Sequence, residues 1–171
     1  SLDVTAISVL FGNEGLLACN GQLSDAMNCG QQFRWIAVEN QGTDPARLAD
    51  LARFTLCPGK AAIPESESLD RGSLHHAQGL MAGCKGVRTR FLLTIDPDFY
   101  VVRRNWMEDV LATMHTHNLT LFGSCWHPRW WYQYRGFPTV HFMLIDLQRL
   151  PLDELDFTPG MREHGFYRTV T

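Results

Sequence analysis

The chain has 171 residues, of which 45% are hydrophobic and 19% are charged, with five cysteines and a formal net charge of −3. This size and composition predict one globular domain, and the slight excess of acidic residues argues against a nucleic acid as partner. No apolar run approaches the roughly 20 residues that span a bilayer. The cysteines are odd in number and form no C-x-x-C pair, so we expect buried structural thiols in a cytoplasmic protein.

Strands and helices are predicted in alternation along the first two thirds of the chain. Apolar, β-branched runs predict strands at 5–11, 33–40, 61–63, 90–95, 119–125 and 139–147. Apolar spacing predicts helices after Asn13, over 44–54, over 73–87 and over 105–117. Asn13 and Asp44 stand where helix N-caps are expected, and Pro45 occupies the favoured first helical position.

This alternation predicts an α/β fold: a single Rossmann-like, mostly parallel sheet with helices on both faces. In such sheets the ligand site lies beyond the carboxyl ends of the strands. The first strand ends in "FGN", the second in "EN" and the long strand at 90–95 in "DPD". We therefore expect these three polar tips to gather at one edge of the sheet and to share a site.

The "DPD" tip places two carboxylates, Asp96 and Asp98, one residue apart. Like charges this close both stay ionised at neutral pH only when a cation or strong hydrogen-bond donors lie beside them. Hard oxygen ligands of this kind suit Mg²⁺ or Mn²⁺ bridging to the phosphates of a substrate. A plain turn is the alternative, because Asp and Pro are both favoured in turns.

Four segments together resemble the motifs of family 2 glycosyltransferases, which have the type A glycosyltransferase fold. They are "VLFGNEGLL", "VENQGTD", "DRGSLHHAQGLMAG" and "FLLTIDPDF", in that order along residues 9–99. The resemblance implies one glycosyltransferase-like domain over 1–171, with a nucleotide-binding part at about 5–100 and an acceptor part at about 101–171. It also implies a UDP-, GDP- or dTDP-linked sugar as donor and a divalent cation, Mn²⁺ or Mg²⁺, as cofactor.

Position by position, the resemblance implies roles for individual residues. Contacts to the donor are implied for Phe11, Gly12, Asn13, Glu39, Asn40, Arg71, Gly72 and Asp96. Asp98, together with Asp96, is implied as ligand of the metal, which would neutralise charge on the departing nucleoside diphosphate. His75 and His76, at the start of a predicted helix, are expected to be exposed polar residues rather than ligands.

An inverting transfer needs a carboxylate that takes the proton of the acceptor hydroxyl. In the family this carboxylate belongs to an acidic motif well after the D-x-D. Here "PLDELDF" and "MREHGFYR" stand in that region, so the candidates are Asp153, Glu154, Asp156 and Glu163. In some type A enzymes a later histidine completes the metal site, which gives His164 an alternative role.

The stretch "CWHPRWWYQYRGFP", residues 125–138, combines large aromatic side chains with arginines. Aromatic rings stack on the apolar faces of sugars and arginines pair with phosphate or carboxylate, so one hypothesis is acceptor binding. A lid over the core and an interface with a partner or with a membrane surface are the alternatives. The acceptor itself is expected to present a hydroxyl, on a carbohydrate, a lipid-linked compound or another molecule.

Two other functions stay open from the sequence. Haloacid-dehalogenase-type phosphatases also place a D-x-D after an apolar strand, although there it usually follows the first strand and is succeeded by Thr or Val rather than Phe99. A non-catalytic domain that binds a nucleotide sugar or a partner is the other alternative, because the acidic motif that would supply the base is imperfect.

Overall fold

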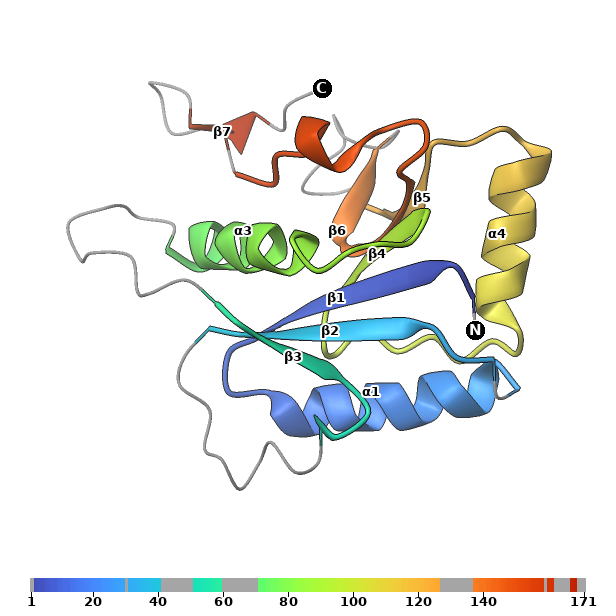
Figure 1. Ribbon diagram of the computed structural model, residues 1–171, viewed down its shortest axis with the longest axis horizontal. Helices are drawn as coiled ribbons and strands as arrows, with labels where there is room; N and C mark the ends of the chain where they lie inside the picture. Colours follow the sequence, from blue (N-terminus) through green and yellow to red (C-terminus); the bar gives the residue numbers. More distant parts are fainter. Residues whose placement is uncertain are drawn as a thin grey trace.

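The computed structural model describes residues 2–29, 31–40, 51–59, 71–126 and 137–158, and the backbone of two short strands at 160–161 and 167–168. Its centre is a six-stranded sheet with the order β3-β2-β1-β4-β6-β5 (Figure 1). The strands are β1 Val4–Leu10, β2 Arg34–Glu39, β3 Thr55–Pro58, β4 Phe91–Ile95, β5 Leu121–Cys125 and β6 Pro138–Asp146. A separate two-stranded sheet pairs β7 Gly160–Met161 with β8 Tyr167–Arg168.

The sheet is parallel at its centre and antiparallel at one side. β1 pairs in parallel with β2 and with β4, and β2 pairs in parallel with β3. β6 runs antiparallel to both β4 and β5. The predicted α/β fold with a mostly parallel sheet is therefore confirmed, and the antiparallel side is formed by the last two predicted strands.

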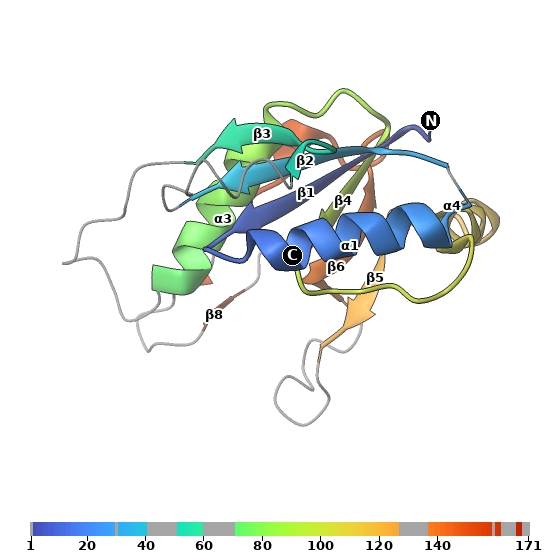
Figure 2. The ribbon, with the colours of Figure 1, turned by 90° about the horizontal axis from the view of Figure 1, so that it is seen from below.

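Helices cover both faces of this sheet. They are α1 Glu14–Met27, α3 Arg71–Cys84 and α4 Trp106–Thr116, with a single 3₁₀ turn, η3, at Leu152–Glu154. Figure 2 shows α1 and α4 on the same side of the sheet, and α3 lies on the other side. In the described part of the chain no helix is long and apolar enough to cross a membrane.

Alternating side chains along the strands build two cores. On β1, Ala6 and Leu10 pack with α1 and α4, whereas Ile7 and Val9 pack with α3. The segment after β6 continues the second core through Leu152, which belongs to η3, and its neighbours. This two-sided burial explains why β1 and β4 read as unbroken apolar runs.

Two glycines let α3 lie close to the sheet. A Cβ atom added at Gly79 would lie 2.5 Å from a methyl group of Val9, and one added at Gly83 would lie 2.7 Å from a methyl group of Ile7. Because the two positions are four residues apart, they lie on the same face of the helix. The glycines in "SLHHAQGLMAG" therefore mark a packing face rather than an interruption of the helix.

Two predicted elements are not tested, and one strand is new. The strand predicted at 61–63 and most of the helix predicted over 44–54, including its cap Asp44, lie outside the described residues. The third strand that the structure describes is β3, at Thr55–Pro58, where the sequence predicts no strand. Of its four residues only Cys57 packs against the core and the other three are exposed, so the short edge strand carries little hydrophobic pattern.

Candidate functional site

The polar tips of β1, β2 and β4 lie at one edge of the sheet, as predicted. Leu10 at the end of β1 is in register with Glu39 at the end of β2, and Ile7 is in register with Thr94 of β4. The N-terminal end of α3 reaches the same edge (Figure 1). The parallel pairing of β1 with β2 and β4 thus brings the "FGN", "EN" and "DPD" segments together, beside the start of α3.

Asp96, the first residue after β4, is held between two histidines. Oδ1 of Asp96 lies 3.3 Å from Nε2 of His76 on α3, and its Oδ2 accepts a hydrogen bond from Nδ1 of His141 on β6. The expectation that His76 is a solvent-facing polar residue is wrong, because α3 packs closely on β1 and turns its first residues toward the sheet edge. His76 and Asp96 side chains are each 22% exposed.

The electrostatic setting of Asp96 follows from these contacts. Partial burial by itself would raise the pKa of Asp96, but the hydrogen bonds and charges of His141 and His76 hold that pKa well below its ordinary range. The same hydrogen bond raises the pKa of His141, although partial burial opposes it. The charge of Asp98 also raises the pKa of His141, so the second aspartate acts on the same histidine.

Asn20 of α1 holds the turn that carries both aspartates. This side chain is 2% exposed, and its Nδ2 donates to the carbonyl oxygens of Asp96, Pro97 and Phe99 at 3.4, 3.3 and 3.0 Å. The N–H of Phe99 donates to the carbonyl of Asp96 at 3.0 Å, which closes the turn. Pro97 is buried and the side chain of Asp98 is exposed. The "DPDF" segment therefore forms a turn, and the turn directs Asp98 outward.

The "FGN" segment forms a second turn at this edge. Gly12 has a φ of +75°, a conformation that suits glycine, and Oδ1 of Asn13 accepts a hydrogen bond from the N–H of Phe11 at 3.0 Å. Asn13 does precede α1, but its side chain makes no cap hydrogen bond to the helix, because its oxygen is already engaged by Phe11. Phe11 meets the ring of His75 edge to face, with centroids 6.4 Å apart.

The remaining donor-site candidates lie around this turn. Nδ2 of Asn40 donates to the carbonyl oxygen of His75 at 2.8 Å, which ties the end of β2 to α3. Glu39 is the last residue of β2 and is partly buried. Arg71 and Gly72 are the first two residues of α3, and a Cβ atom at Gly72 would meet nothing within 4 Å. Open space at a helix N-terminus suits the approach of an anion.

The three described candidates for the catalytic base, Asp153, Glu154 and Asp156, make no contact with the aspartate turn. Asp153 and Glu154 are exposed on η3, and among the described residues no hydrogen bond or ion pair joins either one to Asp96 or Asp98. Asp156 uses Oδ1 to accept the N–H of Thr158 at 2.8 Å, within its own turn. Glu163 and His164 lie outside the described residues, as do residues 127–136 of the aromatic segment.

The side chains at this edge suit one mode of binding a divalent cation. Over the residues that the structure describes, no three His, Cys, Asp or Glu side chains are grouped to hold an ion by themselves. Mg²⁺, however, is commonly held by one or two carboxylates, with substrate phosphates and waters filling the other positions. Asp98 is exposed and lies close enough to His141 to affect its titration. Asp98 and Asp96 are thus the side chains at this edge that could supply hard oxygen donors in that mode.

Sequence patterns missed three residues of the site: Asn20, His76 as a partner of Asp96, and His141. Asn20 lies in a helix whose neighbouring residues are mainly small or apolar, and a buried asparagine there is a weak signal. His141 lies among apolar residues on β6, so the hydrophobic pattern of that strand predicts a core strand and gives no sign of a site residue. Its contact with Asp96 follows from the pairing of β4 with β6, 45 residues apart in sequence.

Searches by sequence find no family model and no curated protein that match this chain. Comparison with solved structures does find matches. Mannosyltransferase PcManGT from Pyrobaculum calidifontis, in complex with GDP-Man and Mn²⁺, has a TM-score of 0.58 at 12% identity over 87% of this chain and 46% of its own. The chain has the type A glycosyltransferase fold. This matches the fold that the sequence motifs implied.

Two further solved structures have the same fold. Glucosyl-3-phosphoglycerate synthase from Mycobacterium tuberculosis, in complex with Mn²⁺ and UDP-glucose, has a TM-score of 0.57 at 11% identity, over 85% of this chain and 56% of its own. TarS of S. aureus has a TM-score of 0.53 at 14% identity, over 70% of this chain and 21% of its own. The chain thus spans about half, or less, of the length of these three proteins.

Proposed function

We propose that this chain is a nucleotide-sugar-dependent glycosyltransferase domain that moves a sugar from a nucleoside-diphosphate sugar to a hydroxyl acceptor with the help of Mn²⁺ or Mg²⁺. The observation that carries the proposal is the Asp96–Asp98 turn at the end of β4 in a type A glycosyltransferase fold. The similar structures of PcManGT and of the M. tuberculosis synthase contain a nucleotide sugar and Mn²⁺, which supports a donor and a cation of these kinds.

The donor would bind along the α3 side of the sheet edge. Phe11, Gly12 and Asn13 would line the base and ribose, with Glu39 and Asn40 beside them. Arg71 and Gly72, at the N-terminus of α3, would approach the phosphates, where backbone N–H groups favour an anion. Asp96, oriented by its two histidines, would face the ribose or the sugar.

Asp98 would hold the divalent cation against the diphosphate, with Asp96 beside it and His141 within its electrostatic reach. When bound, the cation would supply Lewis-acid stabilisation of the charge on the leaving diphosphate. Asn20 would keep the turn in the geometry that places Asp98 outward. Transfer with inversion would further need a carboxylate that accepts the acceptor's proton, and Asp153, Glu154 and Glu163 are our candidates.

The test is the melting temperature of the chain with UDP, GDP and dTDP, each with and without MnCl₂ or MgCl₂. We expect at least one nucleotide to raise the melting temperature, and only with a divalent cation, because binding to the native state stabilises it. Asp98→Asn should abolish this shift. Glu108→Gln, which also removes one exposed carboxylate, should keep it, since Glu108 lies on α4 and bonds Gln31.

No shift with any nucleotide and either metal would disprove the proposal. Hydrolysis of p-nitrophenyl phosphate that is lost in Asp96→Asn would instead favour the phosphatase alternative, with Asp96 as nucleophile. Both results can be obtained from the same purified proteins.

A binding domain without transferase activity is the second candidate. The specific observation in its favour is that Asp153 and Glu154 are exposed on η3 and make no contact with the aspartate turn among the described residues. Cation-dependent nucleotide binding without sugar transfer or donor hydrolysis, over a panel of hydroxyl acceptors, would support this candidate over the enzyme.

A further inference from the structure

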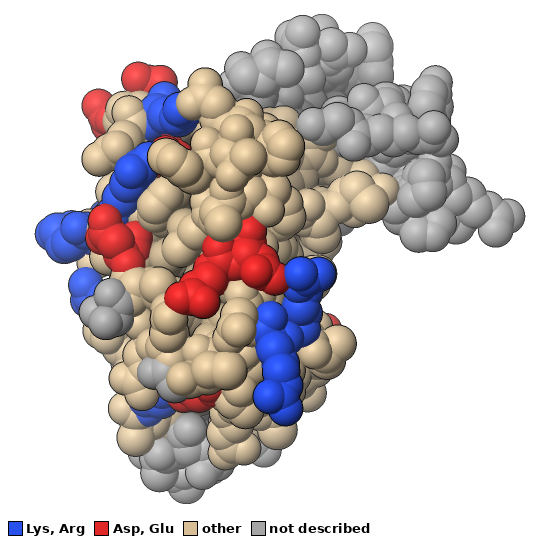
Figure 3. Space-filling view, turned by 90° about the vertical axis from the view of Figure 1, so that its right-hand side faces the viewer, with Lys and Arg blue, Asp and Glu red and all other residues tan. Residues whose placement is uncertain are grey.

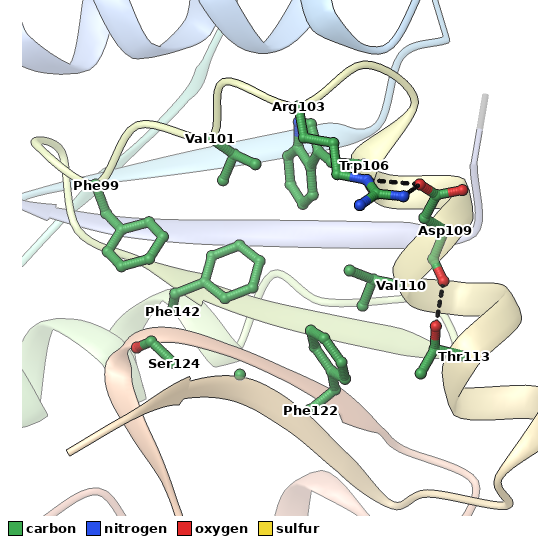
Figure 4. Close-up of a pocket in the computed structure, with 11 residues that line it drawn as sticks. Phe99, Val101, Arg103, Trp106, Asp109, Val110, Thr113, Phe122, Ser124 and Phe142 are labelled. Atoms are coloured by element: carbon green, nitrogen blue, oxygen red, sulfur yellow. Dashed lines mark hydrogen bonds and ion pairs between the residues drawn. The ribbon is translucent and has the colours of Figure 1, made fainter.

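An apolar pocket of about 390 Å³ lies between α4, β5, β6 and the segment that follows the aspartate turn (Figure 4). This volume falls within the roughly 300–1,000 Å³ typical of small-molecule sites. The apolar side chains that line it are Phe99, Val101, Trp106, Val110, Phe122 and Phe142. Figure 4 shows them converging on one space from four separate parts of the chain.

The side chains that line the pocket favour a mainly apolar ligand. Phe99 stacks on Phe142 with centroids 5.0 Å apart, and Trp106 meets Phe142 at 5.6 Å. Trp106 is 2% exposed, and its indole N–H has no hydrogen-bond partner within the described part of the protein. That nitrogen is itself buried, so the indole offers the pocket its apolar ring rather than a polar group.

Charges are confined to the rim of the pocket. Arg103 and Asp109 form an ion pair of 2.7 Å, and their side chains are 75% and 48% exposed. Figure 3 looks at this side of the molecule and shows basic and acidic side chains next to one another, with uncharged surface around them. The rim arginine is therefore already neutralised, and the described lining residues include no other positive charge that would favour a diphosphate.

The pocket adjoins the aspartate turn but opens on the other face of the sheet. Phe99 directly follows Asp98, and Phe142 directly follows His141, the partner of Asp96. Neighbouring residues of a strand point to opposite faces, so Phe142 packs with the α4 core while His141 meets Asp96 on the α3 side. Consecutive Cα atoms are only about 3.8 Å apart, so the pocket residue Phe99 lies within one residue of Asp98 in the turn.

We propose that this pocket binds the apolar part of the acceptor, an alkyl or aryl group attached to the portion that carries the reacting hydroxyl. The acceptor is then an amphipathic compound rather than a free sugar. The apolar group is not part of the nucleotide sugar, because the residues assigned to the nucleotide sugar lie around α3 on the opposite face of the sheet. The identification of the bound molecule as the acceptor rests on the proposed function, whereas the presence of the pocket does not.

The test uses three glucosides that share one sugar: methyl, phenyl and n-octyl β-D-glucoside, the last below its micelle-forming concentration. Their binding is measured by calorimetry in the presence of UDP, GDP or dTDP with MnCl₂. We expect the octyl or the phenyl compound to bind at least tenfold more tightly than the methyl compound. Tighter binding of the octyl compound would indicate an alkyl group in the acceptor, and tighter binding of the phenyl compound would indicate an aryl group.

Filling the pocket gives the decisive variant. Val110→Phe adds a ring inside the pocket, and we expect it to reduce octyl or phenyl binding at least tenfold while leaving the cation-dependent nucleotide shift unchanged. Ala112→Phe adds the same ring to the exposed face of the same helix and should behave as the unmodified chain. Thr113→Phe, which fills the rim, serves as a second filling variant should Val110→Phe fail to fold.

Equal binding of the three glucosides, or octyl binding that survives both filling variants, would overturn the pocket proposal. Tight octyl binding that the filling variants abolish, in a chain that shows no nucleotide shift, would overturn the proposed function and the acceptor assignment with it. The two failures are therefore distinguishable in one set of measurements.

Discussion

Asn20 connects α1 to the turn at the end of β4 through three hydrogen bonds to backbone carbonyls. An amide is suited to this position, since its two N–H bonds can reach neighbouring acceptors that no strand or helix satisfies. Asp96 is fixed in a similar way, by one histidine on each carboxylate oxygen. The orientation of Asp98 thus depends on residues that are not themselves candidates for contact with the substrate.

Asn20→Ala tests this dependence at the scale of one residue. It removes the donor from buried carbonyls, so we expect the free energy of unfolding to fall by about 1–3 kcal/mol, measured by urea denaturation. We also expect a smaller cation-dependent nucleotide shift at equal nucleotide concentration, because a looser turn weakens binding.

Asn28→Ala is the matched control. Asn28 is also a buried asparagine, at the end of α1, but its Oδ1 accepts the N–H of Met107 at 3.1 Å. Asn28→Ala should lower the free energy of unfolding by a similar amount. The nucleotide should still raise its melting temperature by as much as it raises that of the unmodified chain. Equal effects of the two variants on nucleotide binding would contradict a specific role for Asn20.

At the scale of elements, α3 connects the core to the site. Its glycine face, Gly79 and Gly83, sets the distance to β1, and its first turns carry His75 and His76 toward the polar tips. β6 makes the corresponding contribution from the antiparallel side, because His141 is placed by the pairing of Ile95 with Phe142. The site therefore depends on how closely α3 packs and on the register of β6.

Gly83→Ala tests the packing of α3. Helix propensity alone would favour alanine by up to about 1 kcal/mol, but overpacking against Ile7 costs about 1–3 kcal/mol, so we expect net destabilisation. Gly15→Ala on α1 is the control, because a Cβ there meets nothing within 4 Å, and it should be neutral or stabilising by up to about 1 kcal/mol. A Gly83→Ala chain as stable as the Gly15→Ala chain in thermal unfolding would refute the close-packing explanation.

At the scale of the whole molecule, the two edges of the sheet have different roles. The carboxyl edge gathers Asp96, Asp98 and the "FGN" turn. The opposite edge carries a half-buried ion pair, in which NH2 of Arg90, whose side chain is 38% exposed, lies 2.8 Å from Oδ2 of Asp146, whose side chain is 4% exposed. This pair joins the start of β4 to the end of β6 and thereby supports the register that places His141.

The Arg90–Asp146 pair predicts a dependence of stability on pH. The hydrogen bond from Arg90 lowers the pKa of Asp146, against the effect of burial. A carboxylate whose folded pKa is depressed stabilises the native state above its unfolded pKa, about 3.9, and this contribution is lost as pH falls toward the folded value. We expect the free energy of unfolding to drop between about pH 5 and pH 3, and Asp146→Asn to be less stable at pH 7 with a shallower drop.

Arg90→Gln is the partner variant for that experiment. It removes the largest cause of the lowered pKa of Asp146, although the Gln148 N–H and the charge of Arg149 remain, so it should flatten part of the fall in stability over the same interval. Unchanged acid dependence in both variants, followed by urea denaturation at each pH, would show that other carboxylates govern acid unfolding.

Much of the architecture could be predicted because local patterns are sufficient for it. The apolar runs at 5–11, 33–40 and 90–95 predict the three central parallel strands, and their polar endings predict a site at one edge. Asp96 and Asp98 stand out by charge at the end of an apolar run. By contrast, β3 is a short edge strand with little pattern, and the position of η3 depends on packing against the α3 side.

The sequence alone determined the alternation of elements, the polar strand tips and the aspartate pair, since each depends on neighbours within a few residues. Only the tertiary structure decided that Asp96 lies between His76 and His141, that Asn20 holds its turn, and that Phe99 and Phe142 line one pocket. These contacts join residues 20 to 79 positions apart, and hydrophobic periodicity carries no information about which distant polar groups meet.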